Sequence, residues 1–468
     1  MSRTFLMGLL IATAIGGYPF VASIMTLIGA GDTRLPSIAL RFGVALLALW
    51  VVIANRRSIK IYRLEFLIAF AFFWTLYVFQ VINQAFIAQV EMPVNPIEIL
   101  GMIGLFTLIP TIPLFIGLNP DSTRWGFVLL TLITGATAMF MLLDSRDIAL
   151  QMIDESRIRF ELEKLNPISV GYVGGTLLTL CAVGFFRPQR NLRPFQKSLF
   201  AIGMAAGLFT LMISASRGPA VATALTLLVF VLVPFRFDRL LVGAGLGAGV
   251  AAFVVAGRQF VLNRFEIDVF ARFLDAGTAY DSSSESRQTS FSGAWNEFLK
   301  EPILGSSIFE PVTQSYPHNL VLEALMATGV FGGLAYLICV GLMLIAALRL
   351  IYRQDGCEWI ALLAIMYFIG AQFSGAHYAS GAHWLTLVAV VVTEIKLRGV
   401  FFASRARRAR DMAAMQEVAA APRSLAEKEL MTPSGSEAPA NSFQAPGAPA
   451  DTDPAVGSSM GTNLPRSG

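Results

Sequence analysis

The chain has 468 residues, of which 55% are hydrophobic and 14% are charged, and its mean hydropathy is +0.64. About 25% of the residues of an ordinary soluble domain are charged, and a soluble protein of this length could not bury so much apolar surface. The composition therefore excludes a water-soluble enzyme, a disordered chain and a disulfide-rich scaffold. The formal net charge of +4 is too small to indicate a nucleic-acid partner.

The apolar residues fall into twelve runs, most of them close to the roughly 20 residues that a helix needs to cross a bilayer. The runs lie at residues 5–30, 36–54, 64–82, 97–117, 125–143, 168–186, 198–213, 219–235, 240–257, 319–348, 358–374 and 382–395. The first run is too long for a cleaved signal peptide, so we expect it to stay as a span. The pattern predicts an all-α polytopic membrane protein with about twelve transmembrane helices.

The positive charges of the short loops predict the orientation of these spans. Alternate connections contain thirteen lysine and arginine residues, namely Arg56, Arg57, Lys60, Arg63, Arg124, Arg187, Arg190, Arg193, Lys197, Arg236, Arg239, Arg349 and Arg353. The opposite connections at 83–96 and 375–383 contain none. Because positively charged loops stay on the cytoplasmic side, both termini are expected in the cytoplasm.

The remaining segments divide the chain into regions. Spans one to nine occupy residues 1–257 and spans ten to twelve occupy residues 318–398. Between them, residues 258–317 form the largest predicted outer loop, in which five basic residues against eight acidic ones give a net charge of −3. Residues 144–167 carry alternating charge and are expected to form a surface helix that ends at Pro167. Residues 403–468 are expected to be a disordered cytoplasmic tail, because they are rich in Ala, Pro, Ser and Gly.

The large outer loop contains a predicted amphipathic helix. Phe291, Trp295 and Phe298 recur at helical spacing, and Pro302 lies beyond its end. Arg287 opens this helix one turn before Phe291, so the two residues share a face. The helix either lies on the outer leaflet, where it binds membrane lipids, or covers a lipid-linked substrate as a lid. Accordingly, Arg287 contacts either a lipid headgroup or the anion of a substrate.

The turn Ser-Ala-Ser-Arg-Gly-Pro at 214–219 joins the seventh and eighth spans at the outer face. Pro219 suits the first turn of a helix, so the positive end of the helix dipole lies beside Arg217. This combination is typical of an anion site, and arginine can bind a phosphate through two N–H groups. The alternative is an interfacial arginine that reaches the lipid headgroups. Arg41, near the outer end of the second span, is a further candidate for the same cluster.

The sequence Tyr-Pro-His-Asn at 316–319 opens the tenth span at another outer helix N-terminus. The positive helix end favours the neutral form of His318, and neutral imidazole can act as a general base. His377 and His383 fall on the same side, which makes a zinc site conceivable. However, no carboxylate or thiolate with ligand spacing accompanies the three histidines, and the three cysteines show no metal-binding spacing. We therefore expect no metal and no cofactor.

Four motifs then occur in order between residues 210 and 335. Ser-Ala-Ser-Arg-Gly at 214–218 is followed by Arg287 and Trp295, by Pro-Ile-Leu-Gly at 302–305, and by Pro-His-Asn at 317–319. Together they resemble the motifs of the O-antigen ligase and polymerase superfamily. Members of this superfamily are bacterial polytopic membrane glycosyltransferases with a large periplasmic loop. Outside these residues the resemblance extends only to the topology, with the large loop between spans 9 and 10.

The resemblance implies a metal-independent glycosyltransferase of C-type architecture in the bacterial inner membrane, with its active site on the periplasmic side. The donor would be a glycan linked to undecaprenyl diphosphate. Carried over to this chain, Arg217 and Arg287 would bind the diphosphate, and Arg41 is a further candidate for this role. His318 would activate the acceptor hydroxyl.

The superfamily uses three kinds of acceptor: the lipid A-core of lipopolysaccharide, a growing glycan, and a protein side chain. We favour an O-antigen ligase narrowly, because the residue set of the ligases maps directly onto this chain. An O-antigen or exopolysaccharide polymerase and a protein O-oligosaccharyltransferase stay open. A secondary transporter is the alternative from another class, since twelve spans suit one. Transporters usually show two related halves and ionisable residues near the midplane, whereas here the best-placed charges lie at the outer rim.

Overall fold

The computed structural model describes residues 2–29, 34–55, 64–151, 165–186, 192–214, 216–233 and 282–420, with scattered residues between 235 and 248. The basic loops at 56–63 and 187–191, most of the ninth apolar run, residues 258–281 and the tail from 421 lie outside the described residues. The chain divides into two units, Met1–Ser404 and Arg405–Gly468. All elements discussed below belong to the first unit, except the last part of the final helix.

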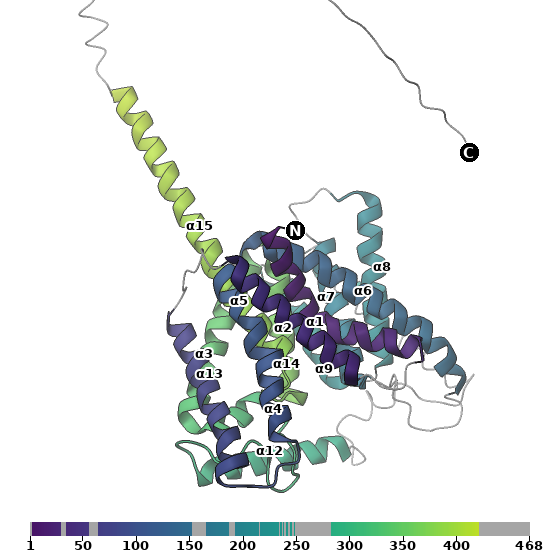
Figure 1. Ribbon diagram of the computed structural model, residues 1–468. Helices are drawn as coiled ribbons and strands as arrows, with labels where there is room; N and C mark the ends of the chain where they lie inside the picture. Colours follow the sequence, from purple (N-terminus) through teal and green to yellow (C-terminus); the bar gives the residue numbers. More distant parts are fainter. Residues whose placement is uncertain are drawn as a thin grey trace, which may run out of the picture. The chain divides into compact units, whose positions relative to one another are not determined.

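The described residues form helices and no β-strand (Figure 1). In chain order these are α1 (Arg3–Leu27), α2 (Arg34–Asn55), α3 (Leu64–Ile82) with the π-helical η2 (Asn83–Ile87), α4 (Pro96–Met102), the π-helical η3 (Ile103–Leu108), α5 (Ile109–Gly117), α6 (Pro120–Gln151), α7 (Pro167–Phe185), α8 (Pro194–Ile213), α9 (Arg217–Leu232), α12 (Ser282–Lys300), α13 (Leu320–Arg353), α14 (Glu358–Ser374) and α15 (Gly381–Ala420).

Apart from α12, the described helices overlap the predicted apolar runs. In the described part of the chain, eight helical segments are long and apolar enough to cross a bilayer, and α9 and α14 are shorter apolar helices. The predicted all-α, multi-pass membrane architecture is therefore confirmed. The count of twelve spans and the periplasmic side of the large loop stay predictions.

The prediction for residues 144–167 was wrong in part. Helix α6 runs without a break from Pro120 to Gln151, so residues 144–151 extend the fifth span and do not start a separate helix. Pro167 begins α7, and residues 152–164 lie outside the described residues. The Asn166 side chain caps α7 by accepting a hydrogen bond from the Ser169 N–H at 2.8 Å. Proline fits this position because the first helical turn needs no N–H donor.

The predicted tail also begins later than expected. Helix α15 continues to Ala420, so residues 403–420 are helical in the structure. This stretch contains many alanine and arginine residues, which are strong helix formers, and it has no proline before Pro422. The prediction of disorder rested on the average composition of residues 403–468, which does not show that residues 403–420 favour a helix.

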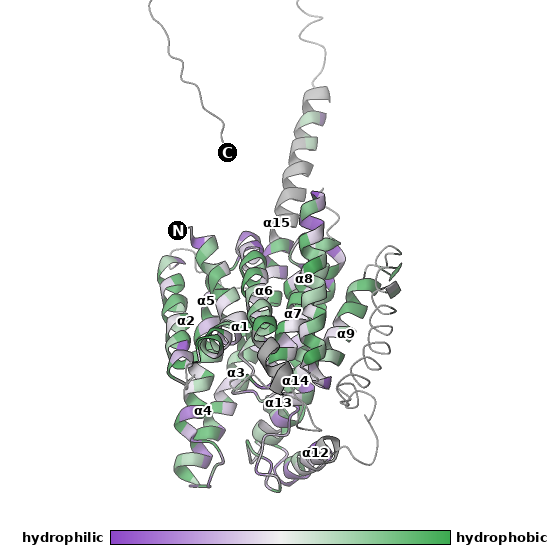
Figure 2. Cartoon of the chain, turned by 90° about the vertical axis from the view of Figure 1, so that its right-hand side faces the viewer, coloured by the Kyte–Doolittle hydropathy of each residue, from purple (hydrophilic) through white to green (hydrophobic). Residues whose placement is uncertain are grey.

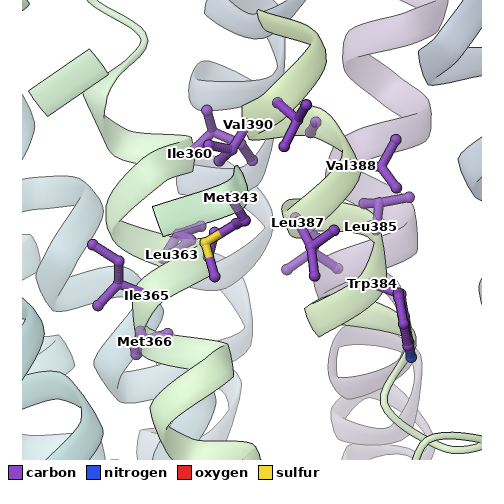
Figure 3. Close-up of a cluster of buried hydrophobic side chains, with 14 of the residues drawn as sticks. Met343, Ile360, Leu363, Ile365, Met366, Trp384, Leu385, Leu387, Val388 and Val390 are labelled. Atoms are coloured by element: carbon purple, nitrogen blue, oxygen red, sulfur yellow. The ribbon is translucent and has the colours of Figure 1, made fainter. Parts of the chain in front are cut away.

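The core of the first unit includes side chains of α13, α14 and the first turns of α15, part of which Figure 3 shows. Residues 359–366 of α14 and 384–392 of α15 are buried on every side of their helices. A helix that is apolar all round and buried all round belongs in the interior of a bundle. In contrast, α2 and α8 expose large apolar side chains such as Leu46 and Ile202, each 65% exposed. The colouring of Figure 2 shows apolar residues along these outer helices, as expected for surfaces that face lipid.

Helices α7 and α8 approach each other through glycines. A Cβ atom on Gly174 would collide with the backbone of Gly207 and Leu211, and a Cβ atom on Gly207 would collide with the backbone of Leu178. In a bilayer, helices associate mainly through close packing, because the lipid tails are as apolar as the side chains. The glycines therefore allow the close contact that stabilises this pair.

We predict that Gly174→Leu destabilises the protein, because the added side chain must separate α7 from α8. Overpacking of this kind costs about 1–3 kcal/mol. The measurement is the thermal midpoint of the protein in detergent, followed by size-exclusion chromatography after heating. Gly341→Leu is the matched control, since no atom lies within 4 Å of a Cβ atom built on Gly341 of α13. Equal loss of stability in both variants would contradict the close packing.

A kink in α13 fixes the segment that follows α12. Gly329 has a φ of +62°, and a Cβ atom there would collide with the backbone of Ile303. The carbonyl of Pro302 accepts a hydrogen bond from the Val330 N–H at 2.8 Å, and the Ser306 N–H donates to a carbonyl of α13 at 3.0 Å. Only glycine combines this backbone conformation with such a close approach. As a result α12 lies across one end of the bundle, next to the start of α13 (Figures 1 and 2).

Candidate functional site

The backbone around His318 is held on both sides. Asn319 caps α13, because its Oδ1 accepts hydrogen bonds from the N–H groups of Val321 and Leu322, both at 3.0 Å. Its Nδ2 donates to the carbonyl of Gln372 on α14 at 3.4 Å. His318 itself has a φ of +57°, which is uncommon for a residue other than glycine. Such backbone conformations persist where the surrounding structure enforces them, and they are frequent at functional sites.

The His318 ring is partly exposed and lies against the Tyr316 ring, with 4.3 Å between the ring centroids. Its Nδ1 is buried and has no hydrogen-bond partner among the described residues. Burial lowers the pKa of His318 below the usual 6.5, and the positive charge of Arg287 lowers it further. The predicted preference for the neutral form therefore agrees with the structure. Its causes are burial and Arg287, whereas the sequence suggested the helix terminus.

Arg287 is the second predicted residue that the structure brings to this place. Helix α12 begins at Ser282, so Arg287 lies in its second turn and does not open the helix. The side chain is partly buried, and its charge acts on the rings of both Tyr316 and His318. The structure therefore places Arg287 of α12 close enough to His318, which precedes α13, for its charge to act on the imidazole.

Helix α12 packs on the following loop through its small and polar side. The Ser290 Oγ lies 3.3 Å from the Thr313 Oγ1, and the Glu297 carboxylate accepts a hydrogen bond from the Ser306 Oγ at 2.9 Å. In contrast, Trp295 remains 46% exposed. The side of the helix that bears Trp295 is therefore not the side that packs on the following loop.

A buried acid that the sequence analysis missed shapes the loop before His318. The Glu310 carboxylate accepts hydrogen bonds from the Val312 N–H at 2.7 Å and from the N–H and Oγ1 of Thr313, both at 2.6 Å. The Glu310 N–H in turn donates to the Ser315 carbonyl at 2.8 Å. These bonds close a tight loop that leads directly into Tyr316. Its signal in the sequence was slight, because an acid in a polar loop is usually solvated.

Arg217 is the first residue of α9, as predicted, and its side chain is partly buried. The preceding turn is closed by the Ser214 Oγ, which accepts a hydrogen bond from the Ser216 N–H at 3.3 Å. A Cβ atom on Gly218 would lie 3.6 Å from Phe373 in the last turn of α14. The neighbouring Gln372 is the residue that Asn319 contacts. Gly218 and Asn319, which follow Arg217 and His318 in the chain, therefore adjoin consecutive positions at the same end of α14.

Arg41, the weakest of the predicted arginines, lies at a different place. Its guanidinium lies over the Phe106 ring at 3.8 Å and near the Tyr18 ring at 5.6 Å. It lines a cavity of about 400 Å³ that Tyr316 also lines. The described lining includes none of the other three predicted site residues. The structure thus separates Arg41 from them by placing it on this cavity.

A second buried acid near the site is Glu323, one turn inside α13, which the sequence motifs did not single out. It is fully buried, accepts a hydrogen bond from the Tyr77 hydroxyl at 2.5 Å, and accepts the His377 N–H through both oxygens at 3.1 Å. It thereby ties α3 and the loop at 375–380 to α13. Its signal was available, because an acid inside a predicted span is rare and marks a place of importance.

His377 is a core residue of this network. Its Nε2 lies 2.8 Å from the Leu320 carbonyl, so Nε2 carries the proton and donates it. Burial lowers the pKa of His377 to about 3, which makes it a poor base near neutral pH. Among the described residues, no three His, Cys, Asp or Glu side chains are grouped so that they could hold a metal ion. The described histidines therefore give the zinc alternative no support.

We predict that Glu323→Ala destabilises the protein, because it leaves the Tyr77 hydroxyl and the His377 N–H buried without an acceptor. Each polar group left in this way costs about 1–3 kcal/mol. The thermal midpoint in detergent should fall clearly. Glu65→Ala is the matched control, since Glu65 is an exposed acid in the first turn of α3 and its loss should leave the midpoint unchanged. A Glu323→Ala protein as stable as the wild type would show that the network does not support the fold.

These features define a class of protein: a multi-pass helical membrane protein in which Arg287 and His318 lie near each other beside α13. Residues 202–337 match the family model described as O-antigen ligase, and this range contains Arg217, Arg287 and His318. The match confirms the resemblance seen in the motifs over the part of the chain that it covers. No curated protein matches the chain.

Proposed function

We propose that the protein transfers a glycan from undecaprenyl diphosphate to an acceptor hydroxyl at the periplasmic face of the bacterial inner membrane. The observation that carries the proposal is the pairing of Arg287 with His318 inside the matched domain. In this proposal the chain has about twelve spans and both termini in the cytoplasm. The favoured acceptor is the lipid A-core of lipopolysaccharide, which would make the protein an O-antigen ligase.

In the proposed reaction, Arg217 and Arg287 bind the donor diphosphate. When the bond between the sugar and the diphosphate breaks, negative charge grows on the leaving phosphate oxygen. Arginine stays protonated and can bind phosphate oxygens through two N–H groups at once. Positive groups held in place before the reaction stabilise that charge more than water does, and they supply this stabilisation without a metal ion.

His318 provides the complementary step on the acceptor. Its neutral imidazole takes the proton of the acceptor hydroxyl while the hydroxyl oxygen bonds to the anomeric carbon and the diphosphate leaves with the bonding electron pair. The His318 ring is partly exposed, so an acceptor hydroxyl can reach it, although its Nδ1 is buried. Arg287 supports this role twice, since its charge keeps His318 neutral and attracts the diphosphate.

A deletion strain tests the function directly. Loss of O-antigen from lipopolysaccharide, together with accumulation of the undecaprenyl-linked glycan, is the result expected of a ligase. Loss of a secreted polysaccharide with intact lipopolysaccharide would instead indicate a polymerase, and loss of glycosylated proteins would indicate an oligosaccharyltransferase. A strain in which all three products are unchanged would overturn the proposal.

We predict that Arg217→Ala and Arg287→Ala each reduce transfer by about 10²–10³-fold, the usual effect of removing one group that stabilises developing charge. Arg217→Lys should remain strongly impaired, because an ammonium group cannot make the paired contact. The assay is glycan transfer by purified protein at equal amounts, with and without a chelator, which should have no effect. Arg124→Ala is the control, since Arg124 is exposed and pairs with Asp121. Normal activity of Arg217→Lys would show that a generic positive charge is sufficient.

We predict an acidic limit of activity below the usual histidine range. Because the pKa of His318 is lowered, the neutral ring persists at pH values below 6.5, and the rate should fall only at still lower pH. His318→Gln should lose about 10²–10⁴-fold in rate, and its residual rate should lack the acidic limb. In Arg287→Gln the limb of the residual rate should move to higher pH, because one cause of the lowered pKa is gone. Substantial activity of His318→Gln would mean that His318 only orients the acceptor.

A further inference from the structure

The cavity beside Tyr316 is not explained by the proposed roles of Arg217, Arg287 and His318. It has a volume of about 400 Å³ and is bounded by parts of α1, α2, α4, η3, α6 and α7, together with the end of α14, the loop at 375–380 and the start of α15. These helices lie far apart in the sequence, so only the folded bundle creates this space. Tyr316 links the cavity to the candidate site, because its ring lies against the ring of His318.

The lining has the chemistry of a carbohydrate site. Hydroxyl and amide side chains of Asn166, Ser169, Tyr172, Tyr316, Tyr367 and Ser374 face this space together with apolar residues. Hydroxyl groups both donate and accept hydrogen bonds, which matches the hydroxyl groups of a sugar. Tyrosine rings add flat apolar surfaces, and those of Tyr172 and Tyr367 are 5.4 Å apart.

Arg41 gives the cavity a positive charge. Its guanidinium lies over Phe106, and its Nε is buried without a hydrogen-bond partner among the described residues. The lining residues that the structure describes include no Asp or Glu. Glu98 acts on Arg41 electrostatically, but it is exposed to solvent and does not belong to the lining. A positive side chain that lines the cavity together with uncharged hydroxyl groups suits a ligand with a negative substituent.

We propose that this cavity binds a sugar unit that carries a carboxylate or phosphate group, and that this sugar belongs to the acceptor glycan. Arg41 would bind the acidic group, and the tyrosines would bind the sugar hydroxyls. The proposal rests on the proposed function, because a sugar that extends past Tyr316 would present its next hydroxyl to His318. It assigns Arg41 to the acceptor, whereas Arg217 and Arg287 bind the donor diphosphate.

A matched pair of amphipathic probes tests the cavity without any transfer reaction. Octyl β-D-glucuronide and octyl β-D-glucoside differ only in the carboxylate. Binding of each is measured by titration to the full-length protein in phosphatidylcholine nanodiscs. We expect the wild type to bind the glucuronide about tenfold or more tightly than the glucoside, as a charge-assisted arginine contact allows. Arg41→Gln should lose this preference and keep its affinity for the glucoside, while the control Arg124→Gln should behave as the wild type.

Three results would overturn the proposal. Equal binding of the two probes by the wild type would show that the cavity does not select acidic sugars. A preference that persists in Arg41→Gln would place the acidic group elsewhere. Displacement of the glucuronide by phosphatidylglycerol added to the nanodiscs would identify the cavity as a site for lipid headgroups.

The same titration separates this inference from the proposed function. His318→Gln and Arg287→Ala should bind the glucuronide as the wild type does, although both should lose transfer. A wild-type protein that selects the glucuronide but transfers no glycan would overturn the proposed function and leave the acidic-sugar site standing. A wild-type protein that transfers glycan but binds both probes equally would overturn only the inference about the cavity.

Discussion

The buried carboxylate of Glu323 is the contact on which the arrangement of the candidate site depends. It joins α13 to Tyr77 of α3 and to His377 in the loop between α14 and α15. In the interior of a membrane protein no bulk water can replace a lost hydrogen bond, so these groups must satisfy one another. The same loop lines the cavity of Arg41, and the first turn of α13 follows His318 directly. The Glu323 carboxylate therefore fixes the start of α13, which follows His318, relative to the loop that lines the cavity.

In the proposed reaction, Arg287 and His318 would act together as a cation and a base. A histidine beside a carboxylate would tend to protonate, and it would then be unable to accept a proton. Beside an arginine, and partly buried, the pKa of His318 falls and the ring stays neutral. In the proposed reaction, the positive charge of Arg287 that keeps His318 neutral would also stabilise the leaving diphosphate. Both effects of the Arg287 charge require that Arg287 lie near His318.

The three arginines selected from the sequence have different surroundings in the structure. Arg217 begins a helix, Arg287 lies within α12 near His318, and Arg41 lines a separate cavity with aromatic neighbours. Charge alone could not separate them, because every arginine at an outer helix end has the same sequence signature. The cavity and the ring contacts separate them, and both arise from packing between helices distant in the chain.

The hydrophobic runs by themselves determined the helical class, the membrane location and most helix boundaries, because about 20 apolar residues in a row have few other places to go. Local motifs such as Pro-His-Asn and Ser-Arg-Gly located His318 and Arg217 at helix starts, since caps and prolines act within a single turn. Sequence could not reveal the partners of Glu323, because Tyr77 and His377 lie on elements that the chain brings near only on folding. Glu310 bonds within its own loop, but an acid in a polar loop is usually solvated, so its burial had little signal in the sequence. Nor could the sequence separate Arg41 from the other arginines or place Arg287 beside His318. Those arrangements depend on tertiary packing, in which the glycines of α7, α8 and α13 set how closely the backbones approach and so decide which side chains meet.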